Sequence, residues 1–380
     1  MSRKDQRDDT YTKTDTDFTY YYHRGGDSGA PGCAGSIKPD AGRHHVRREF
    51  FMKTKKKEKK KGRVMWGFIY VLAFILAFCG SVLFKIAHDP FGDEFSVDWS
   101  DAIGTVHTDL SYGSGDANKF DLYVPADRSR ENYGLIVYLH AGGFTGGDKS
   151  DDEKILKWLC SKGYVTAGIN YTLFGEEHPE ANVYSQSLEI RESIPHVIAE
   201  AENLGYHIDE MAVSGGSAGG CLALLYAYRD ADSSPVPVKM VFEAVGPSSF
   251  YPEDWKSYGF DQDPEAAKAL FSVMAGRELT SEFGTPEYDK EIKDISALLW
   301  VDETTVPTLM AYGMYDKFQP YEGSVRLCKA LEENGVPYDY YLCRHSGHGL
   351  QNDDKVYAEY MRGITDYLNT YMPVKISPIS

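Results

Sequence analysis

Three residues far apart in the sequence have the types and settings of a nucleophile, an acid and a base. The nucleophile candidate is Ser217, which lies in Gly215-Gly216-Ser217-Ala218-Gly219 between a short apolar run and a stretch of helical pattern. Glycines beside the serine allow a sharp strand-to-helix turn that exposes the hydroxyl at the edge of a sheet. A phosphate-binding loop is the alternative, but the Lys and Ser/Thr that it requires do not follow. The pattern therefore predicts that Ser217 is a nucleophile.

The acid and the base are expected after the serine, each in a loop behind an apolar run. Asp316 follows the run at 308–312, and His348 lies between two glycines behind the run at 338–343. A histidine can take the serine proton and return it to a leaving group, while a carboxylate holds the ring in the required tautomer. We therefore predict Asp316 as the acid and His348 as the base. Glu243 is the alternative acid and His345 the alternative base.

A nucleophilic attack on a carbonyl also requires hydrogen-bond donors for the negative charge that develops on its oxygen. The sequence His140-Ala141-Gly142-Gly143-Phe144 directly follows an apolar run that ends at residue 139. The backbone N–H groups of Gly142, Gly143 and Ala218 are the predicted oxyanion hole. His140 is expected to brace this loop with its ring rather than to take part in the reaction.

The chain around these residues alternates between apolar runs and amphipathic stretches. Such alternation predicts an α/β fold with a mostly parallel central sheet flanked by helices. Strands are expected at 134–139, 164–171, 211–214, 240–245, 308–311 and 338–343, with an antiparallel lead-in hairpin at 104–110 and 120–124. Helices are expected at 154–162, 185–203, 218–228, 323–333 and 356–371. The long aromatic-rich connection at about 246–306 is predicted to be a cap over Ser217.

Together these motifs resemble the α/β-hydrolase superfamily, and within it the esterases related to hormone-sensitive lipase and to acetyl and feruloyl esterases. The likeness runs from about Phe120 to Tyr371, and Ala141 departs from the triple glycine of the corresponding loops. The resemblance implies an α/β-hydrolase fold and hydrolysis of carboxylic esters, often of acetyl or other short acyl groups, without a cofactor or metal. Further matching residues are 121–125 (DLYVP), 147–150 (GDKS) and Asn170-Tyr171.

The sequence leaves two alternative functions open. A serine peptidase of the prolyl-oligopeptidase type shares this catalytic domain, but such enzymes normally carry a large extra domain, and no stretch here is long enough for a propeller. A non-catalytic protein of the same fold could bind a partner, although the complete order of serine, acid and histidine favours an enzyme.

The N-terminal part differs sharply from the rest in charge. Residues 1–63 hold 17 Lys and Arg against 9 Asp and Glu, whereas the remaining residues carry a net charge of −25. The first 63 residues are expected to be a disordered basic tail, and residues 1–51 are interpreted as a reading frame called too far upstream, with Met52 as the true start. The strongly negative charge of residues 64–380 repels phosphate groups, which argues against a nucleic-acid partner.

Residues 64–84, from Val64 to Phe84, form an uncharged run of 21 residues, which is long enough to span a bilayer as a helix. Eight Lys and Arg residues lie directly before it, within residues 53–63, so the positive-inside rule predicts a signal anchor with a cytoplasmic N-terminus. A cleaved signal peptide and a buried helix are the alternatives. The hydrolase domain, residues 85–380, would then lie outside the cytoplasm and act on small-molecule or glycan-borne esters at the cell surface. The six cysteines show no metal-binding spacing, and a Cys328–Cys343 disulfide stays open.

Overall fold

An eight-stranded sheet runs through residues 93–375, the part of the chain that the computed structural model describes. The strand order is β1-β2-β4-β3-β5-β6-β7-β8. The pairs β1–β2 and β2–β4 are antiparallel and the others are parallel, so the predicted mostly parallel sheet and its antiparallel lead-in hairpin are confirmed. The strands are β1 (Gly104–Ser111), β2 (Lys119–Pro125), β3 (Tyr133–Leu139), β4 (Val165–Ile169), β5 (Ile208–Gly216), β6 (Val238–Ala244), β7 (Thr308–Gly313) and β8 (Tyr338–Cys343).

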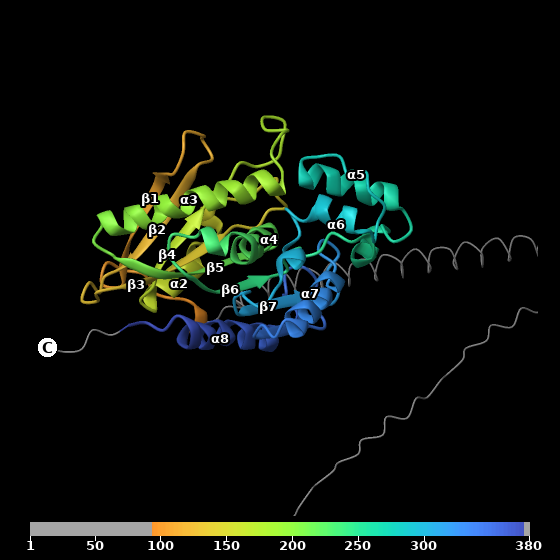
Figure 1. The fold of residues 1–380 in the computed structure, drawn as a ribbon. Coiled ribbons are helices and arrows are strands. Elements are labelled where there is room, and N and C mark those ends of the chain that lie inside the picture. Colours follow the sequence, from red (N-terminus) through yellow and green to blue (C-terminus); the bar gives the residue numbers. More distant parts are fainter. Residues whose placement is uncertain (1–92, 376–380) are drawn as a thin grey trace, which may run out of the picture. The chain divides into compact units, whose positions relative to one another are not determined.

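The central strands are apolar because both faces of the sheet are covered. Every residue of β4 and of β7 is buried, as is typical of strands that are covered on both faces. Helices α3 and α4 pack against each other, and α3 and α8 lie on opposite sides of the sheet (Figure 1). The α-helices are α2 (Glu153–Ser161), α3 (Val183–Asn203), α4 (Ala218–Leu225), α5 (Pro264–Ala275), α6 (Pro286–Ile292), α7 (Glu322–Glu333) and α8 (Asp354–Tyr371). The shorter helical turns are η1 (Asp93–Phe95), η2 (Lys149–Asp152), η3 (Tyr226–Asp230), η4 (Ala231–Ser233), η5 (Pro252–Tyr258) and η6 (Ala297–Trp300).

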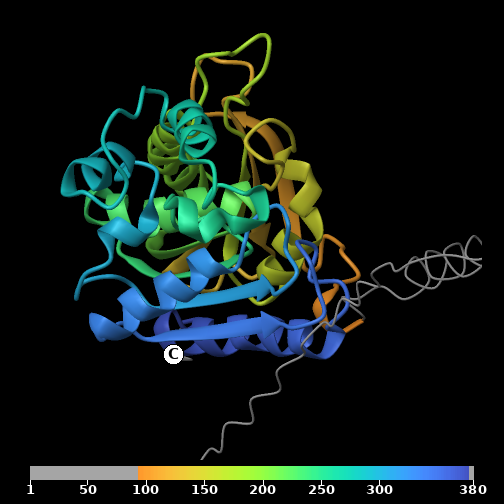
Figure 2. The same ribbon diagram turned by 90° about the vertical axis from the view of Figure 1, so that its right-hand side faces the viewer.

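The long connection between β6 and β7 folds into η5, α5, α6 and η6. Figures 1 and 2 show α5 and α6 on the side of the sheet away from α8. Phe250, Phe271 and Tyr288 are fully buried inside this insertion, so part of its aromatic content forms its own core. We refer to residues 246–306 as the insertion.

Some predictions fall on residues outside the described part. These are the disordered tail at 1–63, the early-start interpretation of 1–51 and the anchor at 64–84. Among the described residues, no helix is both long and apolar enough to cross a membrane. The four described cysteines, Cys160, Cys221, Cys328 and Cys343, are free thiols, so the disulfide left open by the sequence is absent.

Candidate active site

Ser217 occupies a strained turn between β5, which ends at Gly216, and α4, which begins at Ala218. Its φ of 54° is uncommon for a residue with a side chain and is found where the surrounding structure enforces it. The flanking glycines allow close packing, since a Cβ on Gly219 would collide with the carbonyl of Leu139 and one on Gly215 with the backbone of Gly219. The strand–turn–helix predicted around Ser217 is therefore present.

Ser217, His348 and Asp316 form a continuous chain of hydrogen bonds. The Nε2 atom of His348 lies 2.8 Å from the Ser217 hydroxyl oxygen, and its Nδ1 atom lies 2.7 Å from Oδ2 of Asp316. The other carboxylate oxygen of Asp316, Oδ1, accepts hydrogen bonds from the backbone N–H groups of Phe318 and Gln319. An ionised carboxylate can only accept, so the proton of the neutral ring lies on Nδ1 and Nε2 is free to accept the serine proton.

The two alternative residues lie elsewhere. The exposed ring of His345 contacts Asp353, with Nδ1 2.8 Å from Oδ1, and this pairing ties down the loop that carries His348. Glu243 is fully buried within β6, where it accepts the backbone N–H of Gly246 at 2.8 Å. Burial raises the pKa of Glu243 to about 8, partly opposed by that hydrogen bond. Neither residue has a described hydrogen bond to Ser217 or His348.

The predicted oxyanion loop lies beside the serine. Gly142, Gly143 and Ala218 line the same cavity as Ser217 and His348. Both glycines have positive φ, 131° at Gly142 and 61° at Gly143, which is a backbone path that other residues adopt only under strain. Within the described residues, the N–H of neither glycine donates a hydrogen bond. These donors are thus available to a ligand in the cavity.

The loop is anchored by the strand next to it. Asn170, just after β4, accepts the backbone N–H of Lys149 at 2.6 Å and donates to Oδ2 of Asp148 at 2.7 Å. Although burial alone would raise the pKa of Asp148, hydrogen bonds from Asn170 and Ser150 lower it to about 2. The hydroxyl of Tyr171 donates to the carbonyl of His140 at 2.9 Å. The GDKS and Asn-Tyr motifs therefore hold the two ends of one loop.

His140 packs under this loop, as expected for a bracing residue. Its ring stacks on Tyr171 with centroids 4.3 Å apart, and its Nδ1 atom lies 2.8 Å from the carbonyl of Ala141. Burial lowers the pKa of His140, which favours the neutral ring.

A cavity of about 830 Å³ opens in front of Ser217. His348 is the only ionisable side chain among its described lining residues apart from the phenol of Tyr258, and most of the others are apolar. The described residues contain no cluster of His, Cys, Asp or Glu that could hold a metal ion. The apolar lining comes from several loops and from α5, and includes Phe144, Phe174, Val245, Pro247, Trp255, Leu270, Val273, Met274 and Phe318.

Several lining residues were not predicted. Trp255 and Tyr258 belong to the aromatic-rich connection that is predicted to be a cap, but no pattern in the sequence assigns Phe174 or Phe318 to the site. Phe318 lies two residues after Asp316, and its ring centroid is 5.4 Å from that of His348. Proximity to the acid was the one signal in the sequence that could have indicated Phe318.

Comparison with known proteins agrees with this geometry. The profile of the BD-FAE family matches residues 120–331, which include Ser217 and the loop at 140–144. The chain belongs to the BD-FAE family. The membership of the α/β-hydrolase superfamily that the sequence predicted is confirmed.

Curated relatives of this BD-FAE protein carry hydrolase names. Kynurenine formamidase from Salmo salar is 29% identical over 121 residues, covering 32% of this chain and 38% of the relative. Esterase LipI from Mycobacterium tuberculosis is 24% identical over 223 residues, covering 57% of this chain and 65% of the relative. The chain spans about two fifths of the length of the first curated relatives that it matches.

Solved structures support the fold of this BD-FAE chain. The esterase Est2 from Thermogutta terrifontis superposes with a TM-score of 0.57 at 17% identity, covering 73% of this chain and 95% of that one. The likeness identifies the α/β-hydrolase fold.

Proposed function

We propose that this protein is a serine hydrolase that cleaves carboxylic esters through an acyl-enzyme. The observation that carries the proposal is the hydrogen-bond chain from Ser217 through His348 to Asp316, at the edge of a cavity also lined by Gly142 and Gly143. In the first step the Ser217 oxygen attacks the ester carbonyl carbon while its proton moves to Nε2 of His348.

The tetrahedral intermediate carries a negative oxygen, for which the N–H groups of Gly142, Gly143 and Ala218 are the proposed donors. When the intermediate collapses, the bond to the alcohol breaks and His348 returns the proton to the departing oxygen. A water molecule then attacks the acyl-enzyme carbonyl and gives a proton to His348. When this second intermediate collapses, the bond to the Ser217 oxygen breaks, His348 returns the proton to that oxygen, and the acid leaves. Asp316 stabilises the imidazolium in both halves of the reaction.

The lining and size of the cavity restrict the charge and size of the substrates that can bind. A charged group would lose its hydration in an apolar lining without gaining an oppositely charged partner, so an uncharged ester is favoured. Short acyl groups such as acetyl are what the family resemblance implies, and about 830 Å³ also leaves room for larger apolar acyl or aryl groups. The substrate is a small-molecule or glycan-borne ester, and the mechanism requires no cofactor.

A fluorophosphonate probe tests the nucleophile. The full chain should be labelled covalently, and Ser217→Ala should not be labelled. Because Ser214 is buried in β5, the strand that leads to Ser217, Ser214→Ala is the matched control and should label as the wild type does. Undiminished labelling of Ser217→Ala would end the proposal, and so would an unlabelled wild type.

A substrate panel separates an esterase from a peptidase. We expect 4-nitrophenyl esters to be hydrolysed and proline-containing peptide 4-nitroanilides to be left intact. Faster cleavage of the peptides than of the esters would favour the prolyl-oligopeptidase type instead.

For the location, we propose a single-pass membrane protein anchored by residues 64–84, with the hydrolase domain outside the cytoplasm. The support is the uncharged run and the eight basic residues within 53–63, directly before it. Protease treatment of intact cells should remove the hydrolase domain, and full protection of that domain would contradict this orientation.

A further inference from the structure

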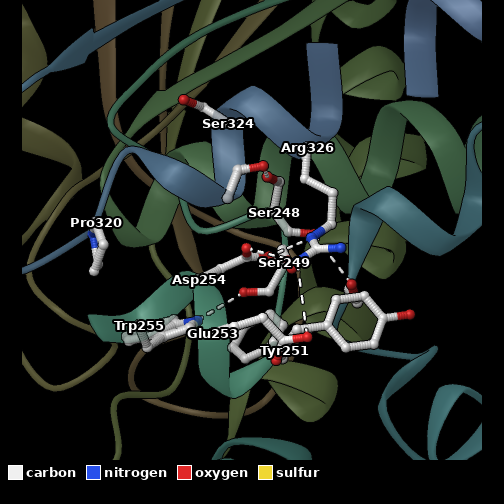
Figure 3. Close-up of polar contacts among 12 residues, drawn as sticks. Ser248, Ser249, Tyr251, Glu253, Asp254, Trp255, Pro320, Ser324 and Arg326 are labelled. Carbon is white, nitrogen blue, oxygen red and sulfur yellow. Dashed lines mark hydrogen bonds and ion pairs between the residues drawn. The ribbon is translucent and has the colours of Figure 1, made fainter. Parts of the chain in front are cut away.

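An ion pair between the partly exposed Arg326 and the buried Asp254 joins α7 to the insertion. Arg326 of α7 donates from Nε to Oδ2 of Asp254 at 2.6 Å and from Nη2 to Oδ1 at 2.8 Å. Asp254, in η5, is buried, and the Ser249 hydroxyl also donates to its Oδ2 at 2.6 Å (Figure 3). A bidentate ion pair of this kind fixes both the distance and the orientation of its partners. We call Arg326 and Asp254 the clamp.

The clamp is directly connected to the cavity wall. Trp255, the residue after Asp254, is buried and lines the cavity, and its indole N–H donates to the carbonyl of Ser249 at 2.8 Å. Ser249 thus contacts the clamp through its hydroxyl and the indole through its carbonyl. Tyr258 ends the same short helix, lines the cavity and donates to the carbonyl of Phe318 at 2.9 Å.

Trp255 in turn supports α5. The ring of Phe271 packs against the indole with centroids 5.4 Å apart. From the same helix, Leu270, Val273 and Met274 line the cavity. A shift of Trp255 would therefore also move the part of the wall that α5 supplies.

We propose that Arg326 and Asp254 are positioning residues that set the fit of the cavity to the apolar group of the substrate. The inference rests on the proposed ester hydrolysis, because it concerns how that substrate binds. Neither clamp residue lines the cavity, so both act through Trp255 and Tyr258.

The clamp is sensitive to the loss of one partner. Without Arg326, the buried carboxylate of Asp254 would keep only the Ser249 hydroxyl, and η5 would have to move to bring the charge to water. Removing the charge of Asp254 at the same time relieves this demand. The effects of Arg326→Met and Asp254→Asn on the substrate preference are therefore expected to be non-additive.

The test is the dependence of kcat/KM on chain length in the full-length protein. Each methylene buried in an apolar wall is expected to raise kcat/KM about three- to fourfold in the wild type. The probes are 4-nitrophenyl esters from acetate to octanoate, which lengthen the acyl group, and acetates of primary alcohols from ethyl to octyl, which lengthen the alcohol. The steeper series identifies the group that occupies the cavity.

In Arg326→Met the preference for octanoate over acetate, or for octyl over ethyl, should fall at least about tenfold, because the methylenes lose their fixed wall. Arg326→Lys keeps the charge and should restore part of the preference. Arg326→Met with Asp254→Asn should lie closer to the wild type than the product of the single variants.

Arg277→Met is the matched control. Arg277 also forms an ion pair within the insertion, with Asp294 at 2.9 Å, but neither residue lines the cavity. This control should keep the wild-type chain-length preference. An unchanged preference in Arg326→Met, or an equal loss in Arg277→Met, would overturn the role of the clamp.

A binding measurement separates failure of the clamp from failure of the proposed reaction. The neutral apolar dye Nile red should bind the cavity of Ser217→Ala, and adding Arg326→Met should weaken its binding at least about fivefold, as loss of one or two methylene contacts would. If the wild type hydrolyses no ester, the proposed function fails and the dye alone decides on the clamp. Equal dye affinity with and without Arg326→Met would overturn it.

Discussion

Phe318 contacts both Asp316 and His348, the proposed acid and base. Its backbone N–H donates to Oδ1 of Asp316 at 2.8 Å, and its ring lies against that of His348, with centroids 5.4 Å apart. The side chain is nevertheless 70% exposed, at the edge of the cavity. The turn after β7 therefore orients the acid with its backbone and covers the base with its side chain.

Asp316→Asn should reduce kcat about 10³- to 10⁴-fold with little effect on folding. Asp316 accepts from His348 through Oδ2, while Oδ1 accepts two backbone N–H groups. If the amide oxygen of Asn keeps the backbone bonds, its NH2 group faces Nδ1 of His348 and selects the wrong tautomer. Steady-state kinetics on 4-nitrophenyl esters, with thermal unfolding as the folding check, measures the effect.

Glu243→Gln is the control for that experiment. The fully buried Glu243 contacts Gly246 rather than His348, so its neutral analogue should keep the wild-type rate. An active Asp316→Asn together with an inactive Glu243→Gln would assign the acid to Glu243 instead.

Gly142 and Gly143 should respond differently to alanine. A Cβ on Gly142 would collide with the backbone of Gly146, whereas one on Gly143 would meet no atom within 4 Å. Gly142→Ala should therefore displace the loop and lower kcat/KM by about 100-fold or more, through loss of oxyanion donors. Gly143→Ala should lower the unfolding free energy by only about 1 kcal/mol, because the left-handed backbone at this position disfavours a residue with a Cβ. Urea unfolding of both variants compares these costs, and equal destabilisation would contradict the collision at Gly142.

The meeting of Ser217, Asp316 and His348 could be predicted because each of these residues follows from a local pattern. Ser217, Asp316 and His348 lie just beyond the ends of β5, β7 and β8, and parallel neighbouring strands bring their carboxyl ends to one edge of the sheet. No knowledge of the loop conformations was needed to place them together.

The ends of elements were harder to predict. Helix α3 begins at Val183 rather than at residue 185, because Asn182 caps it by accepting the N–H of Ser185. Strand β5 begins at Ile208, three residues before the predicted start, since the polar residues Asp209 and Glu210 interrupt the apolar run. Backbone pairing and capping thus extend both elements beyond their apolar pattern.

The cavity wall could not be read from the sequence. Trp255 and Phe271 are both aromatic residues of the insertion, yet Trp255 lines the cavity and Phe271 belongs to the core beneath it. Arg326 and Asp254 are 72 positions apart, and each would pass for a surface charge. Their roles depend on how the insertion folds against α7, which no local pattern encodes.

Lys149→Met should lower the unfolding free energy by about 3 kcal/mol, because it leaves a buried carboxylate without its cation. Lys149 is buried, with its Nζ atom 3.3 Å from the buried Asp121 and 2.9 Å from the exposed Asp109. Lys329→Met is the control, since its pair with Glu333 is exposed and should be worth less than about 0.5 kcal/mol. Urea unfolding measures both, and equal effects would show that burial does not strengthen the Lys149 contacts.

Glu243→Gln should stabilise the protein increasingly as the pH rises from about 4.5 to about 8. Burial raises the pKa of Glu243 from 4.5 to about 8, so between these values the folded state holds a proton that the unfolded state has lost. The contribution of Glu243 to stability is therefore fully present below pH 4.5 and is lost as the pH rises through 8. Glutamine resembles the protonated acid and does not titrate, so the variant gains on the wild type across this window.

The gain should reach the order of a few kcal/mol and level off above pH 8, as measured by urea unfolding of both proteins at several pH values. Glu332→Gln, at an exposed position of α7, is the control and should differ from the wild type by the same small amount at every pH. A difference for Glu243→Gln that stays constant between pH 4.5 and 8 would mean that the folded protein binds no extra proton there. The buried carboxyl would then already be ionised across this range, and the raised pKa of Glu243 would be wrong.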